Sequence, residues 1–317
     1  MDVTRDKDAY RTFCQGKLIP IYSDPIYLDH LLGKRNWGFV GVIEDGKWLA
    51  TFVYPLQKRL FLTTVESQFG LTYTSPILYL EKSLKQVTRY SKQRKVVKLL
   101  VRHLDPYHRF SVSFFPSSQV AEDFSILGFR QRSQMTYNIN LNSAKEDLFL
   151  CLESSVRGHI RKAEKNYTIN YDACIEEFEQ YFQSHQLRKF GKKYSRGGNL
   201  SEWCEYIKRK DLGTFAMSRD YNGNPDAFAL VLWDGSTARL CVSFRTNTKL
   251  SSTSTYLLYW KLIQFAKDRG CHNFDLEGSN IPKVEQTYRS LGGTRVPVSC
   301  LTNWSPSILG KVYDILK

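Results

Sequence analysis

Two acidic residues, Asp275 and Glu277, stand at the end of a short stretch of alternating polarity and directly before a turn and a helix. If residues 271–276 form a strand, the apolar side chains lie on one side and both carboxylates leave on the other. Gly278 ends this strand, and Pro282 suits the first turn of the helix that follows. A strand end, a tight turn and a helix N-terminus can direct backbone N–H groups and acidic side chains at one ligand.

The helix after this turn carries further polar groups. Tyr288 falls on its apolar stripe, Arg289 lies next to it, and the glycine pair beginning at Gly292 ends the helix. A packed strand–helix unit, with its acids paired to Arg289 or Lys283, explains the same residues without any ligand. The residue types alone leave both interpretations open.

A basic helix is predicted near residues 154–166, where Val156, Ile160 and Ala163 form the apolar stripe. Four cations lie on or beside the neighbouring face, and they are Arg157, Arg161, Lys162 and Lys165. This face is either a solvated surface or a binding surface for phosphate or carboxylate groups.

Two further polar segments flank predicted helices. Residues 188–199 form a glycine-containing basic loop in which Lys192 and Arg196 are interleaved with aromatic residues, a composition suited to a planar anion and also found in plain surface loops. Residues 245–255 are a polar run that enters a helix apolar on nearly all sides, so the N-terminus of that helix is expected to face a cleft. Hydroxyl groups there either bind phosphate or cap the helix.

Composition narrows the function classes. The chain has 317 residues and a net charge of +14, so it has room for two domains and should attract an anionic partner such as nucleic acid, coenzyme A, a nucleotide sugar or an acidic lipid surface. The cysteines form no close-spaced pair and are expected to be reduced and mostly in the core, and the histidines lack metal-ligand spacing, so we expect no metal. No apolar run is long enough to span a membrane and the N-terminus is charged, which predicts a cytoplasmic protein.

The elements that must position these residues follow a mixed pattern. In the first half we expect strands at 38–44, 47–56, 60–65, 96–102, 109–115 and 130–141, the last with Met135, Tyr137 and Ile139 on one face, and helices at 81–92 and 120–127. In the second half we expect helices at 154–166, 175–188, 200–210 and 254–269 and strands at 167–171, 214–219, 226–233 and 238–244. The order of elements recurs only roughly.

Two blocks of the sequence resemble one family. The segment Phe274-Asp-Leu-Glu-Gly-Ser-Asn-Ile-Pro-Lys-Val-Glu-Gln-Thr-Tyr-Arg-Ser-Leu-Gly-Gly293, with the helix before it, is similar to the end of FemAB-like members of the GNAT acyltransferase superfamily. Ser154-Ser-Val-Arg-Gly-His-Ile-Arg-Lys-Ala-Glu-Lys-Asn166 resembles the helix that opens the second half of those proteins. The likeness covers residues from about 150 onward well. The first half matches only loosely, through residues 37–54 and 66–73.

This resemblance implies a fold and a chemistry. The fold class would be α/β (mixed α+β), with two tandem GNAT-like domains at 1–150 and 151–317, each a mixed, largely antiparallel sheet flanked by helices. The activity would be N-acyl transfer from an anionic carrier, acyl-CoA or aminoacyl-tRNA, onto an amine of a cell-wall precursor or a metabolite. The absence of a long helical-arm insertion slightly weakens the tRNA version. The oligomeric state and the identities of donor and acceptor are open.

The same resemblance assigns roles. An attacking amine must lose a proton, so Glu277 is the first candidate for the general base and Asp275 the second, while Tyr288 and Arg289 could orient substrate or polarise the carbonyl oxygen. The basic groups at 157–165 and 188–196 would hold the anionic carrier. Three residues at the helix start near 254 correspond to the pyrophosphate-binding turn of GNAT enzymes: Lys249, Ser252 and Ser254.

That turn departs from the family pattern, because serines stand where GNAT enzymes have glycines, and this departure puts tight coenzyme A binding in doubt. A second class of function therefore stays open. The chain could be a non-catalytic module that keeps the fold and a basic groove for a nucleotide or RNA.

Overall fold

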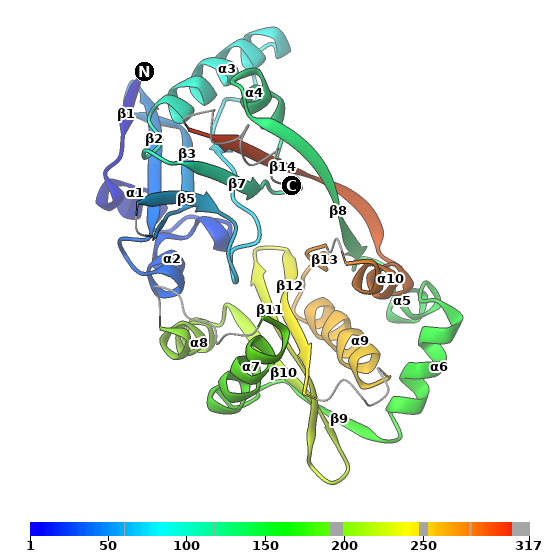
Figure 1. Cartoon of the computed structure of the whole chain (residues 1–317). Helices are drawn as coiled ribbons and strands as arrows, with labels where there is room; N and C mark the ends of the chain where they lie inside the picture. The colour runs from blue at the N-terminus through cyan, green and yellow to red at the C-terminus, as the bar shows by residue number, and fades with distance from the viewer. Residues whose placement is uncertain (60, 117, 191–198, 247–252, 279–280, 306–317) are drawn as a thin grey trace, which may run out of the picture. The chain divides into compact units, whose positions relative to one another are not determined.

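The computed structural model describes the chain except for residues 60, 117, 191–198, 247–252, 279–280 and 306–317 (Figure 1). The chain folds into two compact units. Unit 1 comprises Met1–Gln134 and Pro297–Lys317, and unit 2 comprises Met135–Val296. The chain passes from one unit to the other within a strand on both occasions.

The described residues of unit 1 form two sets of strands and four α-helices. Its helices are α1 (Lys7–Cys14), α2 (Pro25–Leu32), α3 (Gln86–Arg102) and α4 (Ala121–Ile126), with one 3-10 turn, η1 (Ile21–Ser23). One sheet has the order β1-β2-β3-β6, from β1 (Asp2–Thr4), β2 (Trp37–Glu44), β3 (Lys47–Pro55) and β6 (Ile77–Leu78). The other strands of unit 1 have the order β4-β5-β7-β14, from β4 (Gln57–Arg59), β5 (Leu62–Glu66), β7 (Arg109–Ser113) and the end of β14 (Thr294–Trp304).

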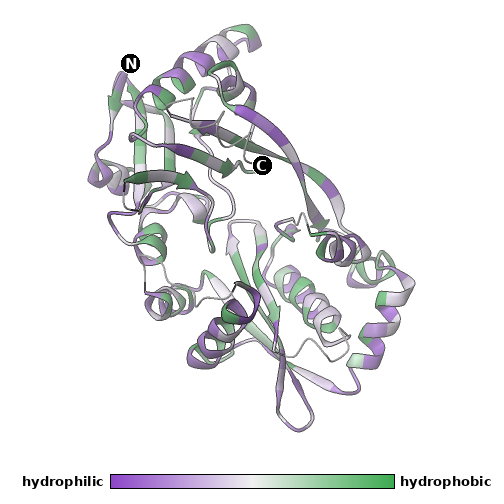
Figure 2. Ribbon diagram, in the orientation of Figure 1, coloured by the Kyte–Doolittle hydropathy of each residue, from purple (hydrophilic) through white to green (hydrophobic). Residues whose placement is uncertain are grey.

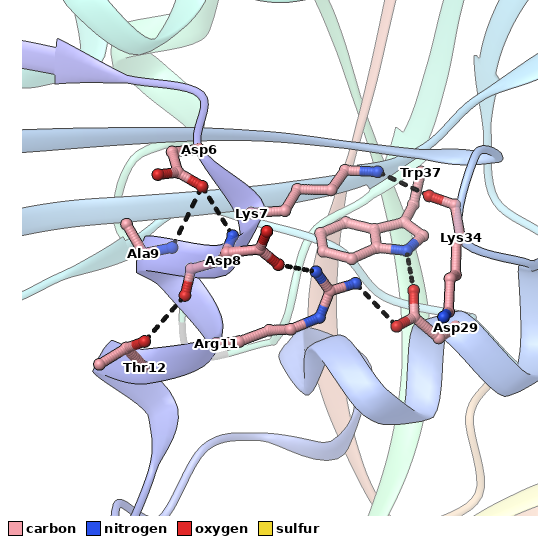
Figure 3. Close-up of polar contacts among 9 residues, drawn as sticks. All are labelled: Asp6, Lys7, Asp8, Ala9, Arg11, Thr12, Asp29, Lys34 and Trp37. Atoms are coloured by element: carbon pink, nitrogen blue, oxygen red, sulfur yellow. Dashed lines mark hydrogen bonds and ion pairs between the residues drawn. The ribbon is translucent and has the colours of Figure 1, made fainter.

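Polar contacts around one buried tryptophan tie α1 and α2 to the start of β2 (Figure 3). Trp37 is 1% exposed, and its indole N–H donates to Asp29 Oδ1 at 2.9 Å. Arg11 of α1 donates to Asp29 Oδ2 at 2.8 Å, and the Lys7 ammonium lies 3.9 Å from the centroid of the Trp37 ring. Burial lowers the pKa of Lys7. These contacts satisfy the buried indole N–H and fix both helices on unit 1.

Unit 2 is built on one sheet with the order β8-β13-β12-β11-β10-β9. Its strands are β8 (Arg130–Asn140), which begins in unit 1, β9 (Tyr167–Asn170), β10 (Gly213–Asp220), β11 (Pro225–Asp234), β12 (Thr237–Arg245) and β13 (Asn273–Asp275). Its helices are α5 (Lys145–Leu150), α6 (Ser154–Ala163), α7 (Ile175–Phe190), α8 (Leu200–Arg209), α9 (Thr253–Asp268) and α10 (Pro282–Ser290). Neighbouring strands are antiparallel with one exception, since β12 and β13 run parallel.

The core of unit 2 forms between this sheet and α9. The middle strands β10 and β11 are buried along most of their length, and Figure 2 shows the hydrophobic colouring of the strands in this region. Leu257, Leu258 and Leu262 of α9 are each at most 1% exposed and belong to the same apolar cluster as Ile160 of α6. The predicted stripe of Val156, Ile160 and Ala163 is confirmed as the buried side of α6.

The order of elements recurs along the chain. In each unit two helices precede an antiparallel hairpin, β2–β3 or β10–β11, and a further helix, α3 or α9, lies in chain order between two parallel strands. These parallel pairs are β5 with β7 and β12 with β13. A short helix and a long final strand follow in each case. The final strands are β8, whose end pairs with β13 in unit 2, and β14, whose end pairs with β7 in unit 1.

Most predicted elements are present, with three corrections. Residues 96–102 are not a strand but the second half of α3, because the apolar residues there pack as a helical stripe with Val96, Val97 and Leu100 buried. Met135 differs in burial from Tyr137 and Ile139 on the same strand, since it is 37% exposed while they are 0% and 6% exposed. The seven cysteines are free as expected, but only Cys204 and Cys271 are buried.

Candidate active site

The parallel strands β12 and β13 pair over only three residue positions. Thr237, Ala238 and Arg239 lie opposite Asn273, Phe274 and Asp275, after which β12 continues to Arg245 while β13 ends. The strand β12 also contains a β-bulge, because the register against β11 skips Cys241. Residues 241–243 of β12 are partly exposed, whereas residues 238–240 are buried. The two strands therefore part at their carboxyl ends, which is where α/β folds commonly bind ligands, next to a bulge of the kind often found at active sites.

The chain turns sharply where β13 ends. The N–H of Leu276 still donates to the carbonyl of Tyr137 on β8, at 2.9 Å. Glu277 then adopts a left-handed backbone conformation with φ of 54°, and Gly278 does so with φ of 56°. A Cβ atom on Gly278 would lie 2.5 Å from the carbonyl oxygen of Met135, so only glycine fits this close approach. A non-glycine residue at positive φ is a local strain of the kind that clusters at functional sites.

Asp275 does not share an exposed face with Glu277, which corrects the expectation from the alternating pattern. Asp275 is 2% exposed, because both faces of β13 are covered. Its Oδ1 accepts hydrogen bonds from the Thr136 hydroxyl at 2.6 Å and from the backbone N–H of Glu277 at 2.8 Å, and its Oδ2 lies 3.4 Å from the Arg239 guanidinium. Asp275 thus holds the turn that carries Glu277.

Tyr288 of α10 lies near both carboxylates. It is 8% exposed, and burial, the Tyr259 phenol and the charges of Glu277 and Asp275 raise its pKa well above the ordinary value for tyrosine. Its ring lies 6.4 Å from that of Tyr259 on α9, whose hydroxyl is hydrogen-bonded to the Ser243 hydroxyl on β12. Tyr288 is therefore a neutral hydrogen-bond donor at physiological pH, and the structure brings it together with Asp275 and Glu277.

The N-terminus of α9 is buried and held by an ionic contact. Ser254 is 0% exposed, and its hydroxyl donates to Asp226 Oδ2 at the start of β11. Asp226 Oδ1 lies 3.3 Å from the Arg245 guanidinium at the end of β12. Arg188 at the end of α7 donates to the backbone carbonyls of Arg245 and Thr246 at 2.8 and 2.9 Å. The Ser254 side chain is thus occupied inside the protein, while the helix start itself lies beside the end of β12.

Two of the α6 cations have contacts within unit 2. Arg157 donates to the carbonyls of Leu150 and Leu152 at 2.9 and 2.7 Å, so it closes the C-terminal end of α5, and Arg161 lies 5.5 Å from the ring of Phe149.

Two contacts set the direction of α6 against α9. His159 stacks on Tyr256 with ring centroids 5.5 Å apart, and Lys261 donates to Glu164, so the two helices run parallel. Lys162 and Lys165 are exposed and lie beyond the first turn of α9, Lys162 one turn after His159 on α6 and Lys165 in the turn that follows α6. Of the α6 side chains, His159 is the one that the contacts place at the start of α9.

Arg289 lies 3.9 Å from Glu285, one turn earlier on α10, and Glu285 accepts a hydrogen bond from the Tyr137 hydroxyl. The predicted contacts Lys192, Arg196, Lys249 and Ser252 fall outside the residues that the structure describes. Sequence reasoning missed four polar residues, because each contacts a partner that is distant in sequence and no local pattern marks it: Thr136, Asp226, Arg239 and Arg245. The internal polarity of β12, with arginines at both ends of its apolar part, was the available signal.

Unit 1 has a polar cavity of about 240 Å³ at the ends of its own parallel pair, β5 and β7. Its lining includes Glu66 and Arg109, whose side chains form an ion pair at 2.7 Å, together with Ser113 and Cys300. The sequence marked this region only through the loose likeness of residues 66–73. Its polar lining consists of serine hydroxyl groups, the Gln134 amide, the Cys300 thiol and the Glu66–Arg109 ion pair.

Membrane-spanning helices and metal clusters are both absent from the described part of the chain. No helix there is long and apolar enough to cross a membrane. Likewise, no cluster of three or more histidine, cysteine, aspartate or glutamate side chains among the described residues could hold a metal ion.

Comparison with proteins of known structure identifies the fold of the chain. No protein-family model matches the sequence, and no match was found among curated proteins. Among solved structures, FemX is similar with a TM-score of 0.61 and 9% identity over 94% of this chain and 97% of the other. L-PGS from Bacillus licheniformis has a TM-score of 0.57 and 14% identity, with 94% and 91% covered, and a tandem GNAT protein from the clavulanic acid biosynthesis pathway has 0.51 and 10%, with 84% and 82% covered. The chain therefore has a FemAB-like fold of tandem GNAT type, as the resemblance predicted.

Proposed function

We propose that the chain is an N-acyltransferase that moves an acyl or aminoacyl group from an activated, phosphate-bearing carrier onto an amine. The observation that carries the proposal is the parting of β12 and β13 beside the bulge at Cys241, with the strained turn at Glu277 at the same strand ends. The partly exposed edge of β12 offers backbone groups to an extended ligand. The likeness of the whole chain to FemX and to a tandem GNAT protein supports the same interpretation.

In this proposal Glu277 is the general base and Asp275 is a positioning residue. The amine nitrogen attacks the carbonyl carbon, so that a C–N bond forms and the C–S bond of a thioester or the C–O bond of an aminoacyl ester breaks. Glu277 takes the proton from the amine, and the leaving sulfur or oxygen receives one from the Tyr288 phenol, which then recovers its proton from Glu277. The raised pKa of Tyr288 keeps its phenol protonated at neutral pH. The burial of Asp275 against Arg239 argues against its serving as the base.

The carrier would lie along β12 with its phosphates at the N-terminus of α9. Backbone N–H groups and the helix dipole favour an anion at this position. The predicted contacts Lys249, Lys192 and Arg196 would add positive charge there, Ser252 would add a hydroxyl group, and His159 would add an imidazole. Lys162, Lys165 and Arg289 are more distant contacts for a long carrier. Acyl-CoA and aminoacyl-tRNA both present a carbonyl and phosphates, so both remain donors in this proposal. The acceptor amine would come from a cell-wall precursor or a metabolite.

Replacing Glu277 with glutamine tests the assignment. We expect turnover to fall by about 10²- to 10⁴-fold, the usual contribution of a general base, while the dissociation constant for coenzyme A changes little. Glu205→Gln on the exposed side of α8 is the matched control and should keep full turnover. Unchanged turnover in Glu277→Gln would remove this residue from the mechanism.

The two donors and the non-catalytic alternative can be separated in one series. Thiol release from acyl-CoA thioesters is measured with a panel of primary amines, and transfer of a labelled aminoacyl group from charged tRNA is measured with the same panel. Release only from thioesters selects acyl-CoA, and transfer only from charged tRNA selects the second donor. No transfer from either donor, together with tight binding of coenzyme A or RNA, would establish the chain as a binding module.

A further inference from the structure

The helix α3 of unit 1 has an unusual composition. Its seventeen residues include six cations and no acidic residue, the cations being Arg89, Lys92, Arg94, Lys95, Lys98 and Arg102. Lys92 is paired with Glu44, and Arg94 lies 3.5 Å from Asp123 while its side chain stays 63% exposed. For the other four cations, the described part of the chain offers no acidic side chain within ion-pair distance. Figure 2 shows hydrophilic colouring recurring along this helix.

Helical spacing places most of these charges on one side. The buried side of α3 is formed by Gln93, Val96, Val97 and Leu100. Arg94, Lys98 and Arg102 follow each other at intervals of four residues on the opposite side, with Lys95 beside them, so they form one stripe about 12 Å long. Like charges at this spacing repel one another, so the stripe lowers the stability of the helix that carries it. An anionic partner would relieve that repulsion.

Apolar residues extend the same surface toward the N-terminus of α3. All residues from 86 to 91 are exposed, and among them Val87 is 79% exposed and Tyr90 is 53% exposed. Val87 lies two turns before Arg94 on the same side, and Tyr90 lies between them, one turn before Arg94. An aliphatic side chain gains nothing from contact with a sugar–phosphate backbone. It gains by leaving water for the boundary of a lipid bilayer, where tyrosine is also favoured.

We infer that α3 is a docking surface for an anionic lipid bilayer. The helix would lie on the bilayer surface, with Val87 and Tyr90 entering the boundary between headgroups and acyl chains. Arg94, Lys95, Lys98 and Arg102 would contact acidic headgroups, their long stems lying along the surface. This inference concerns unit 1 alone and is independent of the proposed acyl transfer. It gives a local reason for part of the strongly positive net charge.

The test is sedimentation of the full chain with vesicles of phosphatidylcholine alone and of phosphatidylcholine with phosphatidylglycerol. We expect binding to the anionic vesicles only, weakening as salt rises. Each cation near an acidic surface contributes about fivefold to partitioning, so Lys95→Glu/Lys98→Glu should reduce it by at least about 25-fold. The control is Arg209→Glu/Lys210→Glu, which reverses two exposed cations of unit 2 and changes the net charge by the same amount. It should reduce partitioning by less than about threefold.

A second variant isolates the apolar part. Val87→Ser/Tyr90→Ser keeps every charge and should lower vesicle partitioning by about tenfold. Binding of the same variants to a transfer RNA is followed in parallel by fluorescence anisotropy. Absent binding to anionic vesicles, or equal losses in the two charge-reversal variants, would overturn the inference. So would RNA binding that depends on Lys95 and Lys98 while vesicle binding does not, because the surface would then be an RNA site. If the double glutamate variant does not fold, Lys95→Gln/Lys98→Gln replaces it.

Discussion

The helices α3 and α9 occupy the same place in the order of elements, each between two parallel strands, yet their N-termini have opposite surroundings. The start of α9 is buried, with Ser254 bonded to Asp226 and Asp226 facing Arg245. The start of α3 is fully exposed, has Lys85 at the N-cap position, and has neither a capping side chain nor an acidic residue in its first turn. One fold thus presents a helix N-terminus either to an internal site or to bulk solvent.

This difference shows which features of the fold are tied to a site. In each unit an acidic and a basic side chain form an ion pair in the segments that precede the helix. In unit 1 the pair is Glu81 and Lys47, whose side chains lie 4.0 Å apart and are 67% and 79% exposed. In unit 2 they are Asp226 and Arg245, whose side chains are 4% and 16% exposed. Exposed pairs contribute little to stability, whereas breaking a buried pair leaves an uncompensated charge. The buried contact therefore holds the end of β12 and the start of α9 in one geometry.

The largest expected effect follows from that contrast. Replacing Asp226 with asparagine removes the carboxylate from Arg245, and we expect the free energy of unfolding to fall by about 3 kcal/mol. Replacing Glu81 with glutamine in unit 1 should change it by less than about 0.5 kcal/mol. Urea unfolding followed by circular dichroism measures both. Equal losses would mean that the two helix starts are held alike and that the comparison fails.

The glycines that follow α4 and α10 are a second pair of corresponding positions in the two units. Gly128 has φ of 93° with open space around it, while Gly292 has φ of 76° and its Cβ position lies 2.7 Å from the carbonyl oxygen of Cys151. Gly128→Ala should cost about 1 kcal/mol through backbone strain, and Gly292→Ala about 2–3 kcal/mol because it adds a clash with backbone. The midpoints of chemical unfolding compare them directly. A similar cost at both positions would show that Cys151 moves away freely.

The sequence predicted the elements well where one type of periodicity was clear. The hairpins β2–β3 and β10–β11 and the helices α6 and α9 were predicted within a few residues. It failed at 96–102, where a short run of valines and leucines fits a strand as well as a helix, and only packing against the sheet decides between them. It also failed for Asp275, because alternation cannot tell a half-exposed strand from one that is covered on both faces.

The candidate site could be predicted only in part for the same kind of reason. Glu277, Asp275 and Tyr288 are close in sequence, so the signal was local, and the structure brings them together. The partners of these residues come from distant strands, as with Thr136 and Arg239, and no local pattern marks them. The basic face of α6 was visible as a pattern, but what Arg157 contacts depends on where α5 ends, which periodicity does not determine.

The free energy of unfolding should also depend on pH through a histidine of unit 2. This effect is expected to be smaller than the two above. Burial, followed by the charges of Lys189 and Arg188, lowers the pKa of His185 to about 4, and its ring lies 5.3 Å from that of Phe244 on β12. Since the unfolded histidine titrates near 6.5, the unfolded state takes up the proton first as pH falls. The stabilisation is thus complete above pH 6.5 and is lost between about 6.5 and 4. After allowance for solvent screening we expect about 1–2 kcal/mol.

Unfolding curves at pH 7 and pH 5 measure this change, and His185→Gln should remove that part of the difference. An identical pH dependence in the wild type and in His185→Gln would place the sensitivity elsewhere. The variant keeps the size and polarity of the side chain, so packing against Phe244 changes little.

The smallest expected effect has the opposite sign and concerns α3. Lys98 lies four residues from both Arg94 and Arg102, so Lys98→Glu converts two repulsive pairs into two attractive ones on an exposed face. We expect the free energy of unfolding to rise by about 0.5–1 kcal/mol, while Lys261→Glu on α9, where Lys261 pairs with Glu164, should lower it. Differential scanning calorimetry at low salt measures both. One outcome is that Lys98→Glu both stabilises the protein and weakens its binding to anionic vesicles. That result would mean that the cations of α3 lower the stability of the fold and serve the binding of a partner. A destabilising Lys98→Glu would mean that the stripe is already balanced within the protein, and the contrast between the two helices would then rest on α9 alone.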